Sequence, residues 1–74
     1  MENQFNFETL SKSLPPLISR DHVEEYLGGV ISPKTLANLD SEGKGPKRMR
    51  IGRKVAYMTV DLLEWLSQRS KPLV

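Results

Sequence analysis

The sequence contains no cysteine and a single histidine, His22, and both shortages limit its chemistry. Without cysteine the chain can form neither a disulfide framework nor a thiolate metal site, and one imidazole cannot build a metal site alone. With 74 residues the chain has room for one small core and little room for a deep catalytic pocket. We therefore expect a single domain that needs no metal or other cofactor and is not an enzyme.

Long apolar runs are also missing from the sequence. The longest are a few residues, far below the roughly 20 that are needed to cross a bilayer. The N-terminal segment contains Glu2 and Glu8 and no uninterrupted apolar stretch, which is unlike a secretory signal peptide. We expect a cytoplasmic protein without a membrane partner.

Basic residues are unevenly distributed, although the net charge is only +2. Residues 43–54 hold six of the eleven basic residues and no acidic one, which leaves five basic against nine acidic residues elsewhere. A neutral to acidic body with one basic projection is typical of a protein that binds a polyanion. The alternative, a solvated basic loop that aids solubility, stays open on charge alone. The six are Lys44, Lys47, Arg48, Arg50, Arg53 and Lys54.

The chain divides at the proline pair Pro15-Pro16. Residues 1–16 are expected to be a weakly ordered N-terminal arm, for which a short helix, a docking arm and a frayed tail are all open. Residues 17–70 carry regular patterns and are predicted to form the domain, and residues 71–74 a tail.

A first helix is predicted over residues 20–27. Ser19 has the side chain of an N-cap, and Gly28 suits the left-handed position that ends a helix. Apolar residues follow at helical spacing, which predicts one narrow buried stripe. The stripe consists of Val23, Tyr26 and Leu27.

A second helix is predicted to begin after Ser32 as N-cap, with Pro33 at its first position and Gly43 after its end. Leu36 and Leu39 are expected to face inward. Two short helices joined by a glycine-containing turn are typical of a helix-turn-helix. A plain helical hairpin is the alternative.

Residues 47–58 change to a period of two, which predicts a β-hairpin with Gly52 in its turn. A three-residue loop over 52–54 would gather the apolar side chains on one face, and we expect this register because pairing follows the apolar face. A two-residue loop would instead set Arg50 beside Val55. The expected apolar face consists of Met49, Ile51, Val55 and Tyr57.

The last predicted element is a helix with Thr59 as N-cap. Its apolar stripe is expected to be buried and contains Leu62, Leu63, Trp65 and Leu66. The order helix, turn, helix, hairpin, helix predicts a mainly α fold with a small β-hairpin, a winged helix-turn-helix.

This order predicts binding to double-stranded DNA. The second helix of a helix-turn-helix can enter the major groove, and a basic hairpin beside it can follow phosphates or reach into the minor groove. An ordinary solvent-facing helix surface is the alternative for the helix residues. The helix candidates are Ser32, Lys34, Thr35 and Asn38, and the hairpin candidates are Lys47, Arg48, Arg50, Arg53 and Lys54.

The stretch 17–66 resembles the small MerR-like winged-helix domains of phage and mobile-element excisionases and of AlpA-type prophage regulators. The motifs that carry the resemblance are, in chain order, YLGG, SPKTL, GP, RIGRKVAY and DLLEWL. The resemblance implies a sequence-specific DNA-binding protein associated with the bacterial nucleoid. It implies an excisionase, a recombination directionality factor that binds repeated sites cooperatively, bends DNA and directs a site-specific integrase.

The resemblance also allows a transcriptional regulator of a prophage or mobile element, or a protein-interaction module of the same fold. One departure concerns the second helix, where relatives often carry arginine at the positions of Asn38, Leu39 and Asp40. Asp40 and Glu42 would repel phosphate if they faced it, so we expect affinity to depend more on the hairpin.

Overall fold

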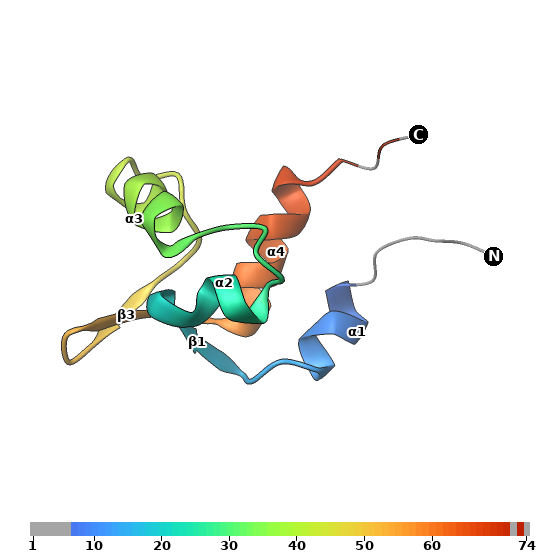
Figure 1. Cartoon of the computed structure of the whole chain (residues 1–74), viewed down its shortest axis with the longest axis horizontal. Coiled ribbons are helices and arrows are strands. Elements are labelled where there is room, and N and C mark those ends of the chain that lie inside the picture. The colour runs from blue at the N-terminus through green and yellow to red at the C-terminus, as the bar shows by residue number, and fades with distance from the viewer. Residues whose placement is uncertain (1–6, 72, 74) are drawn as a thin grey trace.

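Four helices, one 3₁₀ turn and a three-stranded antiparallel sheet make up the described part of the chain (Figure 1). The computed structural model describes residues 7–71 and 73. Among these residues no helix has the length and apolar character that a membrane crossing requires. The elements are α1 (Phe7–Lys12), β1 (Leu17–Ser19), η1 (Arg20–His22), α2 (Val23–Tyr26), α3 (Pro33–Ser41), β2 (Met49–Ile51), β3 (Lys54–Met58) and α4 (Thr59–Arg69).

Strand β3 is the centre of the sheet, with β1 on one side and β2 on the other. Strand β1 was not predicted. Ser19 is the last residue of β1 and occupies the predicted N-cap position, before η1, with the extended backbone (φ −74°, ψ 152°) of an N-cap residue, but its side chain makes no capping bond. The predicted helix over 20–27 is the 3₁₀ turn η1 followed by one turn of α2.

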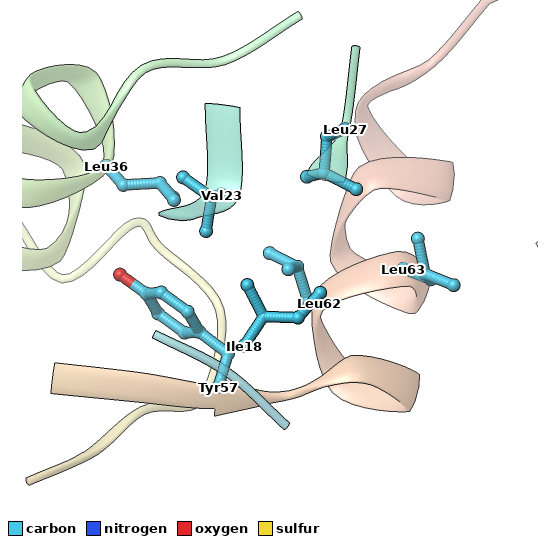
Figure 2. Packing of buried hydrophobic residues seen from close by; sticks show 7 residues of the cluster. All are labelled: Ile18, Val23, Leu27, Leu36, Tyr57, Leu62 and Leu63. Carbon is cyan, nitrogen blue, oxygen red and sulfur yellow. The ribbon is translucent and has the colours of Figure 1, made fainter. Parts of the chain in front are cut away.

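The core lies where the sheet, α2, α3 and α4 meet (Figure 2). Each element contributes one or two fully buried side chains, which remove apolar surface from water and so stabilise the arrangement. Leu10 of α1 packs against this cluster from outside. The buried cluster consists of Ile18, Val23, Leu27, Leu36, Tyr57, Leu62 and Leu63.

Two glycines end the helices as predicted. Gly28 (φ 68°) follows α2 and Gly43 (φ 74°) follows α3, both in the left-handed region that favours glycine. The amide of Lys44 donates to the carbonyl of Leu39 at 2.8 Å, which closes the end of α3.

The register of the hairpin differs from the prediction. Ile51 pairs with Lys54 and Arg50 with Val55, so the turn has two residues, Gly52 and Arg53. Gly52, in the first turn position, has a φ of 63°, whereas Arg53, in the second, does not have a positive φ. A positive φ at the first position alone is typical of a type II′ turn. The three-residue loop was therefore wrong.

This register also separates the four apolar side chains that were expected on one face. Val55 and Tyr57 lie on the core side of the sheet together with Ile18. Met49 and Ile51 lie on the opposite side and remain 38% and 50% exposed.

Thr59 was predicted to be the N-cap of the last helix. It is instead the first residue of α4, and Met58 is in the cap position. The Thr59 hydroxyl donates to the carbonyl of Pro15, and its amide donates to the carbonyl of Pro16 at 2.9 Å. Of the possibilities open for residues 1–16, the structure has a short helix, α1, which packs against α4, while residues 1–6 lie outside the described part.

Two aromatic residues are less buried than expected. Tyr26 is 43% exposed, although it was placed in the buried stripe of the first helix. Trp65 is half-buried against the core and donates from Nε1 to the carbonyl of Lys44 at 2.9 Å. This bond ties α4 to the segment that leads into the hairpin.

Candidate nucleic-acid interface

Helix α3 begins with the predicted cap. The Ser32 hydroxyl oxygen accepts from the amide of Thr35 at 3.1 Å, and the hydroxyl donates to Thr35 Oγ1 at 3.0 Å. Pro33 occupies the first turn, where its missing N–H leaves no bond unmade. Ser32 and Thr35 thus hold each other and fix the start of the helix.

The other predicted helix residues, Lys34, Thr35 and Asn38, lie on the outer side of α3 together with Ser41, and we call these four residues the α3 flank. All four are exposed, while Leu36 on the other side is fully buried and Leu39 is half-buried. The helix therefore presents two polar side chains, Lys34 and Asn38, that make no hydrogen bond or ion pair within the described part of the chain and are free to bind a ligand.

All five predicted hairpin residues are exposed. Lys47 and Arg48 precede β2, Arg50 lies within it, Arg53 is in the turn, and Lys54 begins β3. Arg50 pairs with Val55 across the hairpin, so its side chain leaves the sheet on the same side as Val55 and Tyr57.

That side of the hairpin is the side on which α3 lies. The Tyr57 hydroxyl donates to Asp40 of α3 at 2.7 Å, and Figure 2 shows it directed from β3 toward α3. In Figure 1, α3 and the hairpin turn lie toward one end of the molecule and α1 toward the other, with α4 between them. The cationic hairpin and α3 are therefore neighbours.

Asp40 lies inside the molecule and not on the α3 flank. It is 4% exposed, and its Oδ2 accepts from Arg20 at 2.8 Å as well as from Tyr57. The repulsion of phosphate that was expected from Asp40 is thus removed, because its charge is buried and paired with Arg20. Glu42 is exposed at the end of α3, with the ammonium of Lys44 3.9 Å away.

One of the five hairpin cations has an acidic partner. Lys54 Nζ lies 2.5 Å from Asp21 Oδ2 in η1, and both side chains are more than half exposed. The hydrogen bond and charge of Lys54 lower the pKa of Asp21 below its usual range. Binding of Lys54 to a phosphate would compete with its ion pair to Asp21. We therefore expect Lys54 to contribute less to the affinity for a polyanion than Arg50 or Arg53.

Sequence reasoning missed Arg20 and Asp40 as members of one cluster. The available signal was the spacing of Asp40, four residues after the buried Leu36, which puts a charged residue on the inward side of the helix. A buried charge needs a partner. The cation that pairs with Asp40 is set by how η1 packs against α3, and the sequence predicted a helix at residues 20–27 but not this packing.

No group of three or more His, Asp or Glu side chains is placed to hold a metal ion in the described ranges 7–71 and 73. By sequence the chain matches no protein-family model and no curated protein. The resemblance of residues 17–66 to excisionases therefore stays a prediction.

Proposed function

We propose that the protein binds double-stranded DNA as a winged helix-turn-helix, with the α3 flank in the major groove and the hairpin against the neighbouring backbone or minor groove. The observation that carries this proposal is the side of the hairpin from which Arg50 projects. Arg50 projects from the same side of the sheet as Tyr57, whose hydroxyl bonds Asp40 of α3. We infer that one duplex can contact both the α3 flank and the hairpin.

Electrostatics support the proposal. The hairpin and the segment before it hold six basic residues and no acidic one. The buried Asp40–Arg20 pair takes one acidic charge of α3 out of contact with phosphate. Affinity then comes mainly from phosphate neutralisation by the hairpin, and sequence preference from Lys34 and Asn38.

The biological role that we propose is that of an excisionase, which bends DNA so that a site-specific integrase can act. A protein that occupies both grooves commonly bends the duplex. A gel-shift comparison of fragments with the site at the centre or at the end measures the bend. A bound but straight duplex would leave DNA binding intact and would favour a transcriptional regulator.

The test of DNA binding is a mobility-shift titration with a mixed-sequence duplex at several salt concentrations. If about four hairpin cations neutralise phosphates, affinity should fall roughly 100-fold between 50 and 200 mM salt. Arg53→Ala combined with Lys54→Ala should weaken binding to all sequences and reduce this salt dependence.

The matched control removes two exposed lysines outside the interface, Lys12→Ala with Lys71→Ala, and should change affinity much less. Asn38→Ala should instead reduce discrimination between sites. A hairpin double variant that binds as well as the parent would show that residues 48–54 do not face DNA.

A further inference from the structure

Three elements that are separate in the chain meet at a single atom. Oδ2 of Asp40, in the last turn of α3, accepts a hydrogen bond from Arg20 of η1 at 2.8 Å and from Tyr57 of β3 at 2.7 Å. Tyr57 is fully buried and Asp40 nearly so. We call these three residues the Asp40 cluster.

The cluster is a direct link between α3 and the hairpin. Helix α3 packs against η1, and η1 packs against β3, while α3 and β3 meet through the side chains of Leu36 and Tyr57 in the apolar core. The hydrogen bond from Tyr57 to Asp40 adds a directional link to this apolar contact. A directional bond at such a place can fix an angle that apolar contacts leave free.

Burial of the Asp40 carboxylate is energetically unfavourable in part, because one of its oxygens has no partner among the described residues. Asp40 Oδ1 is buried without a hydrogen-bond partner in the described part of the chain, and Gly45 approaches it so closely that a Cβ there would lie 2.0 Å away. Replacement of a whole buried ion pair by well-packed apolar side chains is often neutral or stabilising, so a buried pair is weak evidence of a stabilising role. Stability alone does not account for Asp40 at this position.

We propose that Asp40 is a positioning residue, which holds α3 at a fixed angle to the hairpin so that both meet one duplex without rearrangement. This inference rests on the proposed DNA binding. Two contact surfaces on a rigid frame gain affinity from each other, because the second contact forms at a high effective concentration once the first is made. A loose frame loses this gain although every DNA-contacting side chain is still present.

The first test measures the frame itself and uses no DNA. Because the chain lacks cysteine, Asn38→Cys and Arg53→Cys place two unique spin labels, one on α3 and one at the hairpin turn. Electron–electron dipolar spectroscopy then reports the distribution of distances between them. We expect one narrow distribution in the labelled parent, and a broader or shifted one after Asp40→Leu or Tyr57→Phe. Tyr57→Phe keeps the ring and carries the test if Asp40→Leu does not fold.

The control for a general loss of stability is Thr59→Val, which removes a buried hydroxyl that bonds Pro15 at the start of α4. Its distance distribution should match that of the labelled parent. Unchanged distributions in both cluster variants would overturn the positioning role, whether or not the protein binds DNA.

The second test compares affinities for the mixed-sequence duplex in unlabelled protein, under conditions where all variants are folded. The cluster variants should bind roughly 2- to 30-fold more weakly than Thr59→Val, the range typical of coupling between linked sites. Equal affinities would overturn the role of the cluster in DNA binding. A parent that binds no duplex would overturn the proposed function. The distance measurement would still show whether the Asp40 cluster fixes the angle between α3 and the hairpin.

Discussion

At the scale of single residues, Tyr57 connects the core to the candidate interface. Its ring packs in the apolar cluster, while its hydroxyl bonds the buried carboxylate of Asp40. Burial raises the pKa of Tyr57 well above its usual range, and the hydrogen bond to Asp40 raises it further. The folded protein therefore binds the phenolic proton more tightly than the unfolded chain does.

This difference predicts a loss of stability at high pH. An unfolded tyrosine releases its proton near pH 10.0, whereas the folded protein keeps it to higher pH. The stabilisation is fully present below pH 10 and disappears as the pH rises toward the folded pKa, at up to about 1.4 kcal/mol per pH unit. Urea unfolding at pH 9 to 11 measures it.

Tyr57→Phe should remove this part of the loss of stability at high pH, and should cost about 2 kcal/mol at neutral pH because the lost hydrogen bond is to a charged group. Tyr26→Phe is the same substitution at a tyrosine that is 43% exposed, and it should leave the fall in place. If the free energy of unfolding fell with pH equally in the parent and in Tyr57→Phe, the buried, hydrogen-bonded environment described for this hydroxyl would be contradicted.

At the scale of elements, the helix ends were easier to predict than the strands. Ser32, Pro33, Gly28 and Gly43 act on neighbouring backbone groups, so their effect can be derived from a few residues. Strand β1 depends on pairing with β3 about 40 residues later, and three residues carry too little pattern to show it.

The prediction of the hairpin register was wrong for a related reason. The apolar grouping favoured a three-residue loop, but the type II′ turn at Gly52 matches the twist of paired strands. The apolar side chains of Met49 and Ile51 are then left on the outer side of the sheet, where Ala56 and Met58 also point. Of the candidate site, the exposure of the helix and hairpin residues could be predicted, whereas the buried link through Asp40 could not.

The cap of α3 provides a prediction at this scale. Ser32→Ala removes the hydroxyl that accepts from the Thr35 amide and should lower the free energy of unfolding by about 1 kcal/mol. Ser41→Ala is the control at the other end of the same helix, where the hydroxyl donates only to the carbonyl of Asn38. Chemical denaturation of both variants checks this expectation, and equal losses would contradict a specific capping role for Ser32.

At the scale of the whole molecule, the two surfaces proposed for DNA share one end of a body 44 Å long. Helix α1 lies toward the other end (Figure 1), whereas the C-terminal end of α4 lies between the two: Arg69 and Ser70 line one hollow together with Ser32 and Thr35. A duplex that contacts the α3 flank and the hairpin should therefore leave α1 unaffected.

The most direct measurement is an NMR titration of the isotope-labelled protein with a mixed-sequence duplex, followed at each backbone amide. We predict that signals of residues 32–38 and 48–54 shift together with one shared dissociation constant, while those of α1 stay in place. Shifts confined to one of the two segments, or centred on α1, would contradict the claim that a single duplex contacts both surfaces.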